Sequence, residues 1–134
     1  MREILFRGKG DKKYNGGMWY FGVPIRCHDG DWQICTDNSK RTVIPETIGQ
    51  YTGLKDKNGT KIFEGDIIYA VSNFDAANMV VVYDPAEFRL VLCEDYKTYK
   101  PGWGFKCLCY ESFYMEVVGN IYDNPELLEG DNNG

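Results

Sequence analysis

The chain has 134 residues and a formal net charge of −5, with 43% hydrophobic and 26% charged residues. This length suits one domain with its own core, and this composition excludes a wholly disordered chain. No apolar run approaches the roughly 20 residues that span a bilayer, and residues 1–4 do not begin an apolar secretion signal. We therefore expect a soluble, cytoplasmic protein without membrane contact.

The composition favours strands over helices. Val and Ile number 18 and the aromatic residues 20, whereas Leu and Ala together number 11. β-branched and aromatic side chains suit a pleated sheet, and the 15 glycines suit tight turns. We expect a small, mainly β fold.

The first third of the chain predicts three strands, a short apolar piece and one helical turn. Pro24 cannot donate to a ladder, so it places its strand at an edge or at a bulge. Pro45 suits the first position of a helical turn over residues 45–50. The strands are expected at residues 2–7, 18–27 and 32–35, and the short apolar piece at 42–44 leads into Pro45.

The middle of the chain predicts hairpins. Asn58-Gly59 suits a type I′ turn between strands that end near Lys57 and start near Thr60. Gly65 and Asp66 form a second tight turn that leads into an apolar strand. Further strands are expected at residues 67–71, 79–83 and 86–93.

The last third predicts a polar, aromatic loop over residues 94–104, then strands near 105–110 and 113–121. Asn124 can cap a helix that starts at Pro125. We expect one domain over residues 1–134, with a folded core over 1–125 and a frayed tail at 130–134.

Charge is distributed unevenly along the chain. Residues 1–61 carry 11 basic and 7 acidic side chains, whereas residues 62–134 carry 4 and 13. The net charge is therefore +4 for residues 1–61 and −9 for residues 62–134. This asymmetry fits either a charged contact between subunits or ordinary solvated surfaces.

The five cysteines are expected to be free thiols, because the count is odd and nothing directs the chain to secretion. The spacings Cys27-x7-Cys35 and Cys107-x-Cys109 match no zinc knuckle. His28 is the single histidine, which excludes sites that need two. Cys27 and His28 would face opposite sides of a strand, so we expect neither a Cys–His dyad nor a bound metal.

Catalytic motifs are missing from the sequence. There is no P-loop and no G-x-S-x-G motif. The pairs Asp29/Asp31 and Glu64/Asp66 could hold a metal or do acid–base work, but each flanks a glycine in a turn, where Asp supports backbone geometry. We expect no catalytic residue, no cofactor and no enzymatic activity.

Two features could bind a partner. Seven aromatic residues lie within residues 96–114 and could stack bases, although packing in the core of a Leu-poor β domain is the favoured interpretation. Basic residues gather around the Asn58-Gly59 turn and could follow a phosphate backbone, although a solvated hairpin tip explains them too. The candidate binding residues are Tyr51, Lys55, Lys57, Lys61, Tyr99 and Trp103.

Three segments resemble the YopX family of phage and prophage proteins. They are Met1–Lys9 with Trp19 and Gly22, the signature-like Ile48–Ile67, and the closing Glu116–Leu128. The resemblance implies a phage origin, a bacterial host cytoplasm and a mainly β fold that self-associates, and it implies no activity. The motif residues are interpreted as scaffold: Asn58, Gly59, Gly65, Asp66, Asn124 and Pro125.

A turn that ends in Gly-Asp before an apolar strand is common in SH3-like barrels, so a small SH3-like barrel or sheet with one or two short helices is expected by analogy. The first functional hypothesis is an oligomeric, non-enzymatic module that binds itself and a host or phage protein. The alternative is a nucleic-acid-associated protein that uses the basic hairpin and exposed aromatics. An acidic protein repels phosphates, which disfavours this alternative.

Overall fold

The computed structural model describes residues 4–11, 13, 17–71, 76–84, 87–100, 106–107 and 114–129. The fold is mainly β, with two antiparallel sheets and three short 3₁₀ helices in this described part. The chain divides into two compact units, Met1–Gly53 and Leu54–Gly134. Trp103, Cys109 and the tail 130–134 lie outside the described residues.

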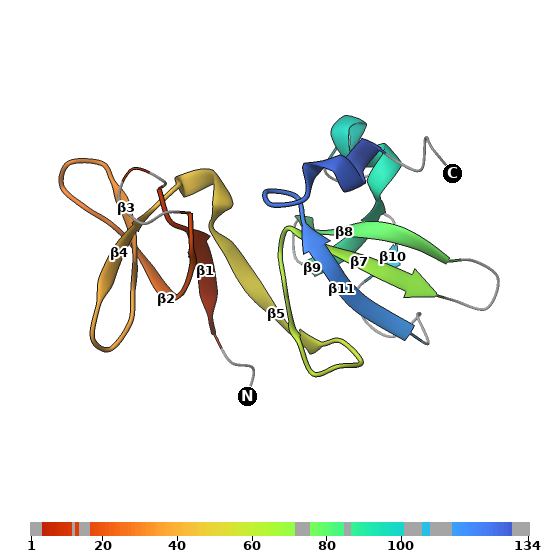
Figure 1. Ribbon diagram of the computed structural model, residues 1–134, viewed down its shortest axis with the longest axis horizontal. Helices are drawn as coiled ribbons and strands as arrows, with labels where there is room; N and C mark the ends of the chain where they lie inside the picture. The colour runs from red at the N-terminus through yellow and green to blue at the C-terminus, as the bar shows by residue number, and fades with distance from the viewer. Residues whose placement is uncertain are drawn as a thin grey trace. The chain divides into compact units, whose positions relative to one another are not determined.

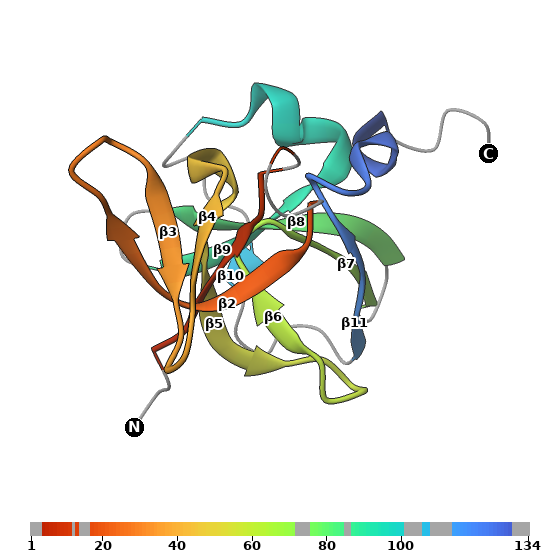
Figure 2. The ribbon, with the colours of Figure 1, turned by 60° about the vertical axis from the view of Figure 1, so that its left-hand side comes forward.

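The first unit is built from a meander of short antiparallel strands. In chain order these are β1 (Phe6–Lys9), β2 (Trp19–Arg26), β3 (Trp32–Cys35), β4 (Lys40–Val43), the 3₁₀ helix η1 (Pro45–Thr47) and β5 (Gly49–Lys55). Their ladder order is β4-β3-β2-β1-β5. Figure 2 shows β4 returning toward β1, where a bridge joins Gly10 to Val43 and the Ile44 amide donates to the Lys9 carbonyl (2.8 Å).

The core of the first unit is small and depends on glycine. Ile34 is fully buried and Val43 is 3% exposed. A Cβ added at Gly8 would meet Val43 Cγ2 at 3.0 Å and Ile34 Cγ1 at 3.1 Å. The side chains of Val43 and Ile34 therefore pack directly against the backbone of Gly8. The strands that flank this core can therefore approach more closely than strands with side chains at Gly8 and Gly22 would allow.

The second unit contains a five-stranded sheet of order β10-β9-β8-β7-β11 (Figure 1). The elements of this unit are β6 (Lys61–Phe63), β7 (Asp66–Val71), β8 (Ala76–Asp84), β9 (Glu87–Leu92), η2 (Cys93–Thr98), β10 (Lys106–Cys107), β11 (Tyr114–Asn120) and η3 (Pro125–Glu129). β6 is the partner of β5, which crosses the boundary between the units.

Both faces of this sheet are covered. On one face Ile68, Val81 and Leu90 pack with Ile62 of β6. On the other face a second cluster is covered by side chains of η2 and η3, which lie side by side over the sheet in Figure 1. The second cluster contains Ile67, Val80, Val82, Val91 and Cys93, with Tyr96, Tyr99, Leu127 and Leu128 packed against it. Two-sided burial explains the continuous apolar runs of β7 and β8, since strands covered on both faces do not alternate.

The prediction of a mainly β fold is confirmed, whereas the prediction of an SH3-like barrel is not. Neither sheet closes on itself among the described strands, and β4 returns to β1 through the bridge at Gly10 and the hydrogen bonds beside it rather than through a continuous ladder. Helices and a hairpin cover the faces of the second sheet, so its strands need no barrel to be buried.

Most predicted elements are present with adjusted ends. β3 occupies the predicted residues 32–35, and the predicted helical turns at Pro45 and Pro125 are η1 and η3. The helix η2 replaces the start of the predicted loop at 94–104. The type I′ turn was wrong: the Asp56 amide donates to the Thr60 carbonyl and the Gly59 amide to the Asp56 carbonyl, which makes a longer loop with Gly59 at φ 84°.

Candidate interaction surface

β2 presents a row of exposed apolar side chains. Phe21, Val23 and Ile25 are 47%, 57% and 45% exposed. Alternate residues of a strand share one face of the sheet, so these three form one continuous row, here called the β2 stripe. Met18, just before the strand, is also exposed. Contiguous exposed apolar surface on a folded protein typically marks a contact with another molecule.

The opposite face of β2 explains why the stripe points outward. Gly22 faces β3, where an added Cβ would stand against the Cys35 carbonyl and 3.2 Å from Ile34 Cγ2. Pro24 pairs with Ile34 in the antiparallel register. Gly22 and Pro24 therefore occupy the crowded side of the sheet, and the larger side chains of Phe21, Val23 and Ile25 are left in solvent.

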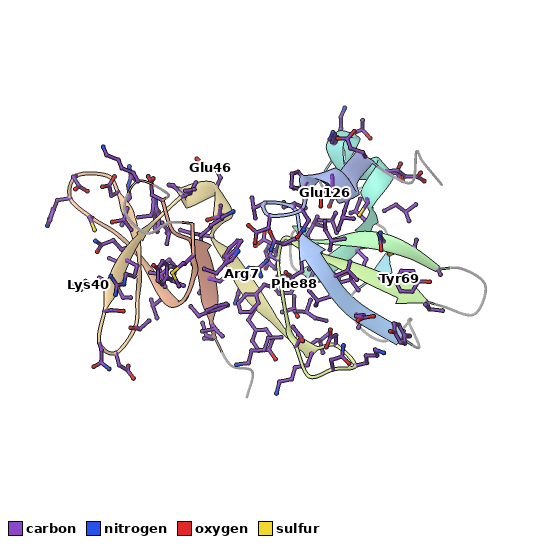
Figure 3. The ribbon with its side chains drawn as sticks, in the orientation of Figure 1. Arg7, Lys40, Glu46, Tyr69, Phe88 and Glu126 are labelled. Carbon is purple, nitrogen blue, oxygen red and sulfur yellow. The ribbon has the colours of Figure 1, made fainter. Side chains whose placement is uncertain are left out.

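A hollow of about 380 Å³ adjoins the end of the stripe. Ile25 lies at its edge, and Cys35, Gln33 and Lys40 line it together with Arg26. The register places Val23 opposite Cys35 and Cys35 opposite Lys40, so these side chains share the face of the stripe. Figure 3 shows Lys40 on β4. The stripe therefore ends in a polar recess with two cationic side chains.

Cys27, His28 and Cys35 all line this hollow, yet they form no metal site. Cys35 is paired with Val23, four residues before Cys27, which directly follows β2. At about 3.3 Å per residue the two cysteines stand about 13 Å apart along β2, too far for a disulfide or a shared ion. Within the described residues no three His, Cys, Asp or Glu side chains are grouped to hold a metal.

The basic residues of the β5–β6 hairpin are partly engaged within the protein. Lys55 and Lys57 are exposed and Lys61 is half-buried. The Lys57 ammonium lies 4.5 Å from the centre of the Tyr114 ring. Interaction with the Tyr114 side chain raises the pKa of Lys57, with smaller contributions from Glu116 and Asp56. Lys57 therefore already has an aromatic and anionic environment of its own.

The aromatic candidates are placed in or near the core. Tyr51 is 4% exposed. Tyr99 packs against the apolar cluster beneath η2 and η3. Trp103 lies outside the described residues. A base-stacking platform needs exposed rings, so the nucleic-acid alternative stays a prediction that these two tyrosines do not support.

The model of the YopX family, described as YopX protein, matches residues 8–129. The chain belongs to the YopX family. A crystal structure of protein EF1440 from Enterococcus faecalis is similar over 96% of this chain and 100% of that chain, with a TM-score of 0.51 and 23% sequence identity. No curated protein matches. None of the described helices has the length and apolar character needed to cross a membrane.

Within the signature-like segment 48–67, residues 56–60 form a structural motif centred on Asp56. Its buried carboxylate accepts hydrogen bonds from the amides of Asn58 (2.8 Å), Thr60 (2.9 Å) and Val117 (2.9 Å). The first two bonds shape the turn, and the third ties the turn to β11, 61 residues away. Asn58 and Gly59 are exposed at the tip of this turn.

The second part of the YopX signature also holds strands together. The carboxylate of Asp66, 2% exposed, accepts a hydrogen bond from the Phe63 amide at 2.7 Å. Gly65, at φ 92°, donates its amide to the Val81 carbonyl and accepts from the Ile121 amide. The turn therefore lies among three segments of the second unit.

The closing YopX motif forms a compact asparagine network. Asn120 Oδ1 accepts hydrogen bonds from the amides of Tyr122 (3.0 Å) and Asp123 (2.9 Å). Asn124 Oδ1 accepts the Asn120 amide at 3.1 Å, and the Asn124 carbonyl accepts the Leu127 amide at the start of η3. Pro125 is the first residue of η3.

The β2 stripe was missed by sequence reasoning. Residues 18–27 are apolar on nearly every position, and such a run is typical of a strand buried on both faces. The signal that could have revealed the stripe is the pair Gly22 and Pro24. These two residues place little side-chain volume on one face of the strand, so the large apolar side chains of Phe21, Val23 and Ile25 form a row on the other face.

Proposed function

We propose that this YopX-family chain is a non-enzymatic phage or prophage protein of the host cytoplasm that assembles with copies of itself through the β2 stripe. The observation that carries the proposal is the exposure of Phe21, Val23 and Ile25 on one face. Water contact with such a row is unfavourable, and burying it against another molecule removes that cost.

Charge favours a second copy as the occupant. Residues 1–53 carry 8 basic and 6 acidic side chains, a net +2, whereas residues 54–134 carry 7 and 14, a net −7. The recess beside the stripe adds Arg26 and Lys40 to its rim. A weakly basic, apolar face complements the acidic second unit of another copy, and such head-to-tail contacts close into rings when the rotation permits.

The non-enzymatic part of the proposal rests on the state of the nucleophilic and basic groups. His28 is the single histidine and is exposed in a turn. Burial raises the pKa of the Cys93 thiol to about 11. A thiol with that pKa stays protonated near neutral pH and is a poor nucleophile.

We expect Phe21→Ser/Val23→Ser to weaken self-association by about 30-fold or more, because about 2 kcal/mol of apolar burial is removed from the contact. Sedimentation velocity over a range of protein concentrations measures this. The control is Ile4→Ser, which removes a 76% exposed apolar side chain outside β2. Circular dichroism confirms that each variant remains folded.

Three outcomes contradict the proposal. One is a wild-type protein that stays monomeric at the highest concentration tested. The second is a folded double variant that associates as strongly as the wild type. The third is a loss in Ile4→Ser equal to that in the double variant.

A further inference from the structure

A second hollow, separate from the β2 stripe, lies in the second unit and has a volume of about 470 Å³. It is found on the face of the sheet that η2 and η3 cover. Asn78 and Tyr69 are register partners on β8 and β7 and belong to its lining. The hollow therefore occupies the end of that face, beyond the apolar cluster beneath the two helices. This volume falls within the range of sites that hold small ligands or side chains.

Two carboxylates come to this hollow from different helices. Glu94 is the second residue of η2, and Glu126 is the second residue of η3. Both are exposed, and within the described residues neither forms an ion pair. Lys97 and Glu129 join the same two helices at 2.7 Å, which helps to hold the carboxylates on one side of the unit.

An aromatic ring faces the same recess. Tyr69 is 38% exposed and lines the hollow. Its ring meets Tyr114 edge-on, with centres 6.3 Å apart and planes at 79°. Figure 3 shows Tyr69 on the sheet and Glu126 on the helix above it. Aromatic faces attract cations, so ring and carboxylates favour the same kind of ligand.

The remaining walls are apolar. Ala76, on the same face of β8 as Asn78, and Leu127 of η3 line the hollow. Cys93 lines it as a protonated thiol, since burial raises its pKa to about 11, and a thiol of this kind behaves as a small apolar side chain. A ligand that fits must combine a cationic head with an aliphatic body.

We propose that this hollow binds a primary alkylammonium group, with the ammonium held between Glu94, Glu126 and the Tyr69 ring and the alkyl chain against Ala76 and Leu127. The net charge of −7 on the second unit attracts such a cation and repels anions. Two sources share this chemistry, a free aliphatic amine and the side chain of a lysine.

The test is a titration of the full chain followed by NMR, with hexylammonium, the blocked amino acid Nα-acetyl-lysine amide, and hexanol as a neutral probe of the same length. We expect saturable shifts of the amides of Ala76, Cys93 and Leu127 with the two cations, and affinity for hexanol at least about tenfold lower. Tighter binding of hexylammonium identifies a free amine as the ligand, and tighter binding of the blocked lysine identifies a protein side chain.

Matched variants test whether the carboxylates of Glu94 and Glu126 bind the cation. Glu94→Gln/Glu126→Gln should weaken hexylammonium binding by about tenfold, whereas Asp95→Asn, which removes a neighbouring carboxylate outside the hollow, should leave it unchanged. Equal binding of hexanol and hexylammonium would overturn the proposal. So would shifts confined to other parts of the chain, or the same loss in Asp95→Asn as in the double variant.

Discussion

Asp56→Ala should lower the free energy of unfolding by about 3 kcal/mol, because three amides that now donate to a carboxylate would lose their acceptor. Two of these amides shape the β5–β6 turn, and the third belongs to Val117 on β11. Asp56 is 8% exposed, so water cannot fully replace the lost acceptor. Urea unfolding followed by circular dichroism measures the change.

The control for this prediction is Asp29→Ala. Asp29 also accepts a backbone amide two residues ahead, that of Asp31 at 2.9 Å, but it is exposed in a turn of the first unit. Its loss should cost about 1 kcal/mol or less. Equal losses in the two variants would contradict the assignment of Asp56 as the residue that joins the hairpin to β11.

The contribution of Asp56 should also depend on pH. Burial raises the pKa of its carboxyl, and the amides of Val117, Thr60 and Asn58 together with Lys57 outweigh this, so the net pKa lies below its ordinary value of 3.8. A carboxyl with a lowered pKa stabilises the fold above its unfolded pKa and loses that effect as the pH falls through the folded value. The difference between wild type and Asp56→Ala should therefore shrink below about pH 4. A difference that stays constant down to the acid transition would contradict this.

Gly22→Ala is expected to destabilise the first unit by about 3 kcal/mol through overpacking. The added methyl would stand against the Cys35 carbonyl oxygen, 2.9 Å from its carbon and 3.2 Å from Ile34 Cγ2. Cys35 is paired with β2 on one side and β4 on the other, so its backbone carbonyl cannot move aside as the end of a flexible side chain can. Hydrogen exchange of the β2 and β3 amides reports the loss within this unit.

Gly30→Ala separates this clash from ordinary backbone strain. Gly30 has φ 94°, and nothing lies within 4 Å of an added Cβ. Its substitution should therefore cost about 1–2 kcal/mol through conformation alone. If Gly22→Ala proved as mild as this control, the close packing of β2 on β3 would be contradicted.

Local signals predicted much of the fold. Trp32–Cys35 alternates and is bounded by turn residues, and β3 forms there. Pro45 and Pro125 fix φ at the start of a helix, and η1 and η3 begin at these residues. η2 was missed because Leu92, which precedes it, offers no side-chain cap that could be read from the sequence.

Features that depend on distant contacts could not be predicted. The boundary between the two units falls at Gly53, within β5, where no change of composition marks a linker. In the sequence Asp56 cannot be distinguished from any other aspartate in a turn, because its hydrogen bond with the Val117 amide forms only in the folded chain. The hollow in the second unit combines Tyr69, Glu94 and Glu126, and only the folded sheet and helices bring these together.

The most direct test of self-assembly through the β2 stripe is photo-cross-linking from position 23. Val23 is replaced by a photoreactive phenylalanine analogue, with the same replacement at Val118, which is 42% exposed in the second unit, for comparison. We predict efficient cross-links between copies from position 23, suppressed when Phe21→Ser is added. Absence of copy-to-copy cross-links from position 23 in a protein that sediments as an oligomer would contradict the account.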